Sequence, residues 1–78
     1  MAEIRLLSAL KPGQKGKIVK VSGSGAVHRR ILDMGVVPGA EIEVERVAPL
    51  ADPVEFKLLG YHLSLRKDEA RNVRVEVS

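Results

Sequence analysis

The chain has 78 residues, a formal net charge of +3 and a hydrophobic content of 45%, and it contains no cysteine. This length predicts a single domain over residues 1–78 with enough apolar side chains for a core. The missing cysteine excludes disulfides, thiolate metal sites, iron–sulfur clusters and a cysteine nucleophile. No apolar run approaches the roughly 20 residues of a membrane-spanning helix, and the N-terminal segment does not fit a signal peptide, so we expect a cytoplasmic protein.

The charge is distributed unevenly along the chain. The segment that ends at Arg30 carries a net charge of +6, and the remainder carries −3. A basic half of this kind could attract either nucleic acid or the acidic face of a protein, and charge alone does not distinguish them.

The first half of the chain predicts a helical turn, a strand and a helix. Within residues 6–16 we expect a short helical turn. It should end at Pro12–Gly13, a pair suited to a type II turn. Residues 16–23 are rich in β-branched side chains and predict a strand. From residue 22 to 35 the apolar positions change to a helical period, with Ser24 as a possible cap and Gly35 as a left-handed end. The expected inner face of this helix consists of Val27, Ile31 and Met34.

The second half predicts further strands separated by turns. Residues 40–47, 53–59, 61–66 and 73–77 alternate between apolar and polar side chains, and residues 67–72 form one helical turn before the last strand. We therefore predict a mainly β protein, a small closed SH3-like barrel of about five strands with one inserted helix, in which the first and last strands meet. The principal core residues would be Ile18, Val44, Phe56, Leu63, Leu65 and Val75, and Tyr61 is also expected to face inward.

Three motifs, "RRILDMGVVPG" (29–39), "APLADP" (48–53) and "LSLRKDEA" (63–70), occur in the order and at about the spacing of the FeoA family. The chain resembles this family from Leu6 to Val77. The resemblance implies a small cytosolic SH3-like protein of the ferrous-iron uptake system, in its free-standing form, related to the C-terminal domain of DtxR-type metal-dependent repressors. It also implies a partner, FeoB, a membrane permease with a GTP-binding domain. Ala51 departs from the glycine that the family often has there, and alanine would be strained if this position requires a positive φ.

The loop at residues 48–53 is one candidate for the partner-binding surface. Leu50 lies between two prolines and would form an exposed apolar tip that is already ordered before binding. Asp52 precedes Pro53 and is expected to hold the loop by bonding to nearby backbone N–H groups. Alternatively, the loop folds back and covers one end of the barrel.

Arg29, Arg30 and neighbouring Met34 are the other candidates for partner binding. A glycine-rich segment before a helix with arginines could hold an anion, but the spacing does not fit a Walker phosphate-binding loop. The family resemblance implies that an arginine reaches toward the GTP-binding domain of FeoB. The alternative is a solvated helix face on which Arg29 pairs with Asp33.

Neither a resident metal nor catalysis is expected from the sequence. His28 and His62 are far apart and lack HxH or HxxxH spacing, so we expect no cofactor and at most an adventitious metal ion at either histidine. The serines do not occur in a nucleophile motif, and Glu41, Glu43 and Glu45 share one solvent-facing side of a strand. We therefore predict a non-enzymatic binding module that assists or regulates ferrous-iron uptake by docking onto FeoB.

Two other functions fit parts of the sequence. "PGQKGKIVKVSGSG" (12–25) resembles the KOW element of RNA-binding SH3-like barrels, although exposed aromatic side chains for base stacking are missing. Edge strands of a nearly closed barrel could also pair between copies and cause weak self-association.

Overall fold

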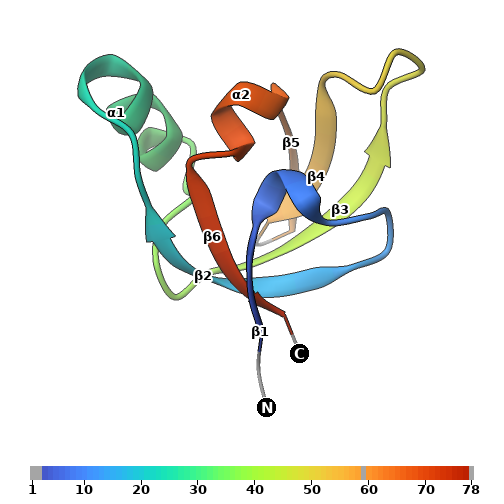
Figure 1. Cartoon of the computed structure of the whole chain (residues 1–78), viewed down its shortest axis with the longest axis horizontal. Coiled ribbons are helices and arrows are strands. Elements are labelled where there is room, and N and C mark those ends of the chain that lie inside the picture. Colours follow the sequence, from blue (N-terminus) through green and yellow to red (C-terminus); the bar gives the residue numbers. More distant parts are fainter. Residues whose placement is uncertain (1–2, 59, 78) are drawn as a thin grey trace.

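The computed structural model describes residues 3–58 and 60–77, which form strands and short helices (Figure 1). The order along the chain is β1 (Glu3–Leu6), the 3-10 helix η1 (Leu7–Ala9), β2 (Lys15–Val21), α1 (Gly25–Asp33), β3 (Glu41–Val47), β4 (Val54–Leu58), β5 (Tyr61–Leu65), α2 (Lys67–Ala70) and β6 (Val73–Val77). The architecture is mainly β, as predicted. Among the described residues, no helix has the length and apolar character needed to cross a membrane.

The six strands form one antiparallel sheet in the order β1-β6-β2-β3-β4-β5. Pairing of β2 with β6, from Gly16 opposite Val77 to Val21 opposite Val73, confirms that the first and last predicted strands meet. The prediction missed β1, which adds to the free side of β6. The predicted closure was also wrong, because β1 and β5 are both edges of an open sheet.

The core contains all six of the principal residues predicted from the sequence. Ile18, Val44, Phe56, Leu63, Leu65 and Val75 are all buried. Two expectations for inner residues were wrong, since Tyr61 is 42% exposed and Val27 is 43% exposed. Val27 lies in the first turn of α1, which reaches beyond the edge of the core, whereas Ile31 of the same helix is fully buried.

The turns of the chain follow the expected glycine and proline positions. Gln14 N–H donates to Lys11 O at 3.0 Å around Pro12–Gly13, and Gly13 has a φ of 91°, as a type II turn requires. Gly35 ends α1 with a φ of 92°. Ser24 occupies the N-cap position, but its side chain makes no capping hydrogen bond.

Three segments that are distant in sequence lie at the same end of the sheet. The helices α1 and α2 and the loop between β3 and β4 all project from the upper end in Figure 1. This arrangement brings α1, the loop of residues 48–53 and α2 to one end of the molecule.

Candidate functional site

The loop of residues 48–53 is a tight, hydrogen-bonded projection. Ala48 N–H donates to Pro53 O at 3.0 Å, and Ala51 N–H donates to Ala48 O at 2.7 Å. The Asp52–Pro53 peptide bond is cis, and Ala51 has a φ of 68°. Leu50 is 90% exposed at the tip, so its side chain does not fold back to cover the barrel.

Asp52 connects this loop to α2. Its carboxylate Oδ1 accepts a hydrogen bond from the backbone N–H of Lys67 at 3.0 Å. Lys67 is the first residue of α2, and its N–H has no acceptor within the helix. The sequence predicted that Asp52 would bond to backbone N–H groups nearby, but the N–H that it binds belongs to a segment fifteen residues away.

Glu69 connects α2 to α1. Its Oε1 accepts a hydrogen bond from Arg66 N–H at 3.0 Å, which satisfies the backbone just before the helix. Its Oε2 lies 3.2 Å from Nη1 of Arg30 on α1. The Glu69 side chain is only 12% exposed, whereas that of Arg30 is 67% exposed. One nearly buried carboxylate therefore fixes α2 and attracts the guanidinium of the neighbouring helix.

The two arginines of α1 differ in their surroundings. Arg30 forms the ion pair with Glu69, whereas the ion pairs found in residues 3–58 and 60–77 do not include the expected pairing of Arg29 with Asp33. Both arginines are exposed. The geometry therefore leaves Arg29 without an ion pair among the described residues and places Arg30 beside Glu69 of α2.

Met34 contributes to the surface through its backbone. Its carbonyl oxygen, at the C-terminal end of α1, accepts a hydrogen bond from the Tyr61 hydroxyl. Its half-buried side chain packs against the core. A side chain added at the next residue, Gly35, would meet the same hydroxyl, so this corner has no room for one.

The structure thus links all three predicted segments through α2, a role that the sequence did not reveal. Asp52 reaches the start of α2 and Arg30 reaches Glu69. The sequence contained part of the evidence for the role of Glu69, because a glutamate three residues after the N-cap is half of a capping box. It was missed because Arg66 occupies the cap position in place of the usual serine, threonine, aspartate or asparagine.

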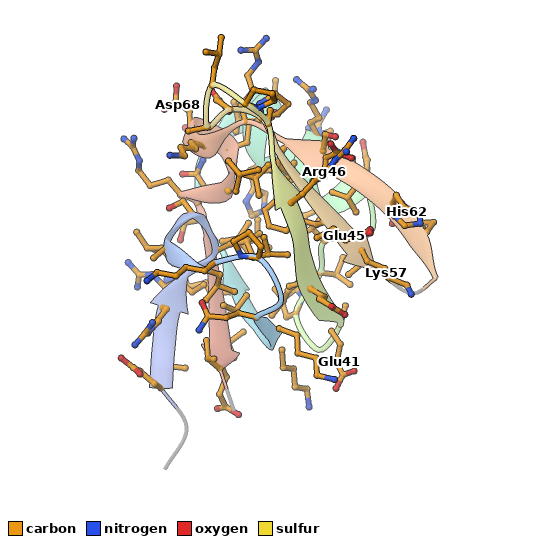
Figure 2. All side chains as sticks on the ribbon, turned by 90° about the vertical axis from the view of Figure 1, so that its right-hand side faces the viewer. Glu41, Glu45, Arg46, Lys57, His62 and Asp68 are labelled. Carbon is orange, nitrogen blue, oxygen red and sulfur yellow. The ribbon has the colours of Figure 1, made fainter. Side chains whose placement is uncertain are left out.

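The two histidines lie on separate surfaces. Nδ1 of His28 is 3.3 Å from the carbonyl oxygen of Ser22. His62 of β5 pairs with the carboxylate of Glu45 on β3, and Figure 2 shows both on one face of the sheet with Lys57. Among the described residues, no group of three or more histidine, aspartate or glutamate side chains is arranged to hold a metal ion.

An open, strongly bent six-stranded sheet with a helix after its second strand defines a small SH3-like module. The family model for the FeoA domain matches residues 5–77, and the chain belongs to the FeoA family, which is linked to ferrous-iron transport. It is 44% identical over 71 residues to an Fe(2+) transport protein A/Fe(2+) transporter FeoB fusion protein of Porphyromonas gingivalis. This match covers 91% of the chain but only 8% of that relative's length.

Solved structures agree with this assignment. The FeoA-like protein of Clostridium acetobutylicum superposes with a TM-score of 0.89 at 42% identity, covering 99% of this chain and 90% of that one. The FeoA of Stenotrophomonas maltophilia, described as a prokaryotic SH3 domain protein and solved in complex with zinc, gives a TM-score of 0.75 at 25% identity, covering 97% and 88%. A manganese-dependent transcriptional repressor shares the fold alone, with a TM-score of 0.88 at 16% identity over 100% of this chain and 44% of the repressor.

Proposed function

We propose that this chain is a non-enzymatic binding module that docks onto FeoB, the ferrous-iron permease with a GTP-binding domain, and thereby assists or regulates iron uptake. The fusion protein of Porphyromonas gingivalis carries this proposal, because a module 44% identical to this chain is joined there to FeoB in one polypeptide. Joining two proteins in one chain raises their effective concentration for each other, which is useful when they act together.

The docking surface in this proposal consists of Leu50, Asp52 and Pro53 of the loop with Arg29, Arg30 and Met34 of α1. Leu50 supplies an apolar side chain that is 90% exposed on a loop already held by internal hydrogen bonds. Such preorganisation reduces the entropy that is lost on binding. Arg29 supplies a cation for an acidic group or a phosphate oxygen of the partner. Asp52 connects the loop to α2, Arg30 pairs with Glu69 of α2, and the Met34 carbonyl accepts the Tyr61 hydroxyl.

The described aromatic side chains favour this proposal over RNA binding. Phe56 is fully buried, and the hydroxyl of Tyr61 is bonded to the Met34 carbonyl. Only the ring of Tyr61 is partly exposed, at 42%, and a single ring offers less stacking than the series of aromatic side chains on which RNA-binding surfaces stack successive bases. RNA binding is therefore kept as the alternative function that the test must distinguish from docking onto FeoB.

The test is a backbone-amide NMR titration of the chain with the GTP-binding domain of FeoB, loaded with a GTP analogue. We expect shifts at residues 24–34 and 48–53. Leu50→Ser removes the apolar tip without touching the core and should weaken binding about tenfold or more, since a buried leucine contributes about 1.5–3 kcal/mol. Val19→Ser is the matched control, because Val19 is 40% exposed on β2, outside the proposed surface.

A parallel titration with structured RNA at low and high salt addresses the alternative. Salt-sensitive shifts along residues 15–20, with no response to the GTP-binding domain, would contradict the docking proposal and favour a nucleic-acid partner. Equal affinities for the Leu50 and Val19 variants would show that the loop is not part of the interface.

A further inference from the structure

The strand β1 forms one of the two edges of the open sheet. Its inner side pairs with β6, with Glu3 opposite Val77 and Arg5 opposite Val75 (Figure 1). Its outer side has no strand beside it in the described part of the chain. An uncovered edge carries backbone N–H and C=O groups that can pair with another strand.

The register of the sheet shows which backbone groups of β1 face outward. Ile18 N–H donates to Ala40 O, toward β3, so its neighbour Lys17 faces β6 and pairs with Glu76. Backbone groups alternate in direction along a strand, so Val75 and Val77 face β1, where they meet Arg5 and Glu3. The N–H and C=O of Ile4 therefore point away from the sheet.

The side chains of β1 carry a self-complementary pattern. Glu3 and Arg5 lie on the same face, since Oε2 of Glu3 is 3.1 Å from Nη2 of Arg5. Ile4 points to the opposite face and is 52% exposed, beside a shallow hollow lined by Ile4, Arg5, Leu6 and Arg74. A glutamate and an arginine thus flank an exposed isoleucine symmetrically.

We propose that β1 is a contact surface for a second copy of this chain, paired antiparallel about a two-fold axis at Ile4. In this register the N–H and C=O groups of the two Ile4 residues bond to each other, which uses the outward groups of the strand. The same register places Glu3 of each copy opposite Arg5 of the other, and opposite charges in cross-strand positions stabilise the pairing. The two Ile4 side chains meet on the opposite face. This inference is independent of docking onto FeoB.

The other edge, β5, does not offer an equivalent surface. Its apolar side chains Leu63 and Leu65 are already buried in the core, and His62 is paired with Glu45 within the same copy. The sequence of β5 contains no glutamate and arginine that would face each other across a two-fold axis, and its exposed Tyr61 is bonded through the hydroxyl to the Met34 carbonyl of the same copy. The pairing therefore closes as a dimer through β1 and does not propagate as a fibre.

The contact is weak because the pairing involves only the short strand β1. Specific stable interfaces bury about 1,200 Å² or more, and a pair of four-residue strands falls well below that. We therefore expect fast exchange between monomer and dimer, seen as concentration-dependent NMR shifts confined to β1 and the adjoining part of β6.

A charge exchange between chains tests the register. Glu3→Arg places two arginines on β1, and Arg5→Glu places two glutamates there. In a dimer of either variant with itself, like charges would face each other, so the dimerisation constant should fall about tenfold. An equimolar mixture of the two variants restores opposite charges at both positions and should dimerise as the original chain does. The double variant Glu3→Arg with Arg5→Glu also restores opposite charges between the two copies, here in a dimer of identical chains.

A cross-linking measurement tests the two-fold position. The chain has no cysteine, so Ile4→Cys introduces a single thiol. Residues opposite each other in a hydrogen-bonded pair have Cα atoms about 5.5 Å apart, within the range that a disulfide spans. We expect mild oxidation to link Ile4→Cys chains at least several times faster than Leu50→Cys chains, whose thiol is more exposed.

Three results would overturn the proposal. The first is shifts that do not depend on concentration up to the millimolar range, and the second is concentration-dependent shifts at other elements. The third is a mixture of the charge variants that dimerises no better than either variant alone. Equal cross-linking of the Ile4 and Leu50 variants would place the axis elsewhere and contradict the proposed register.

Discussion

Arg30 and Glu69 join α1 to α2 across 39 residues of sequence, with Nη1 of the guanidinium 3.2 Å from Oε2 of the carboxylate. The other carboxylate oxygen of Glu69 accepts the N–H of Arg66. The pair is asymmetric, because the glutamate is nearly buried and the arginine is mostly exposed. This asymmetry predicts that the two residues contribute unequally to stability.

Glu69→Ala should lower the free energy of unfolding by about 1–3 kcal/mol, because it removes a backbone cap and leaves Arg66 N–H without its acceptor. Arg30→Ala should cost less than about 1 kcal/mol, since an exposed guanidinium gains little from an ion pair. Urea denaturation followed by circular dichroism measures both. Asp68→Ala is the control on the same helix, because its side chain is 88% exposed. Equal losses for Glu69 and Arg30 would contradict this interpretation.

Asp52 should contribute to the order of the loop as well as to stability. Asp52→Ala removes the acceptor of Lys67 N–H and should cost about 0.5–2 kcal/mol, as for other helix caps. Amide hydrogen exchange at residues 48–53 should then become faster. Asp52→Asn keeps an acceptor oxygen and should preserve most of the slow exchange. Unchanged exchange in Asp52→Ala would show that the hydrogen bonds within the loop are sufficient to order it.

At Ala51, glycine should give a more stable protein than the natural alanine. Its φ of 68° lies in the left-handed region, where a side chain costs about 1–2 kcal/mol. Ala51→Gly should therefore raise the urea midpoint slightly, although the greater freedom of glycine in the unfolded chain offsets part of the gain. Ala51→Val should lower the midpoint, because a β-branched residue fits this conformation less well. A lower midpoint for the glycine variant would contradict this account.

A substitution at Gly35 should lower the free energy of unfolding more while Tyr61 keeps its hydroxyl than after the hydroxyl is removed. Gly35→Ala costs about 1–2 kcal/mol from the positive φ alone. The loss should be larger than this, since the added Cβ would meet the Tyr61 hydroxyl. In a Tyr61→Phe background the alanine substitution should cost measurably less, and a double-mutant cycle from urea denaturation isolates that difference. A coupling free energy near zero would mean that Tyr61 moves aside freely.

The sequence predicted most of the fold because burial alternates regularly in its strands. Phe56 and Leu65 were assigned to the core from this alternation and are fully or almost fully buried. The strand β1 was missed because its four residues, Glu3 to Leu6, are too short a run for their alternation of charged and apolar side chains to identify a strand. Tyr61 was wrongly assigned to the inner face, because it fits the alternation of apolar and polar side chains but lies at the first position of β5, beyond the core.

The candidate surface was predicted only in part. The exposed tip at Leu50 was one of two alternatives drawn from the surrounding prolines, and a positive φ at Ala51 was raised only as a condition, from the glycine that the family often has there. The connection through Glu69 was not predicted, because it depends on how α1 and α2 meet in space. Local patterns identify caps and turns, whereas ion pairs between distant elements require the tertiary arrangement.

The distinction between the two arginines of α1 leads to a prediction about the partner. If the GTP-binding domain of FeoB contacts this helix, Arg29→Ala should weaken binding about tenfold, because its guanidinium has no ion pair among residues 3–58 and 60–77 and is free to meet an anion. Arg30→Ala should weaken binding less, since it acts by holding α1 against α2. Arg29→Lys keeps the charge and should restore part of the affinity. The NMR titration gives each dissociation constant, and a larger loss for Arg30→Ala than for Arg29→Ala would assign the contact to Arg30.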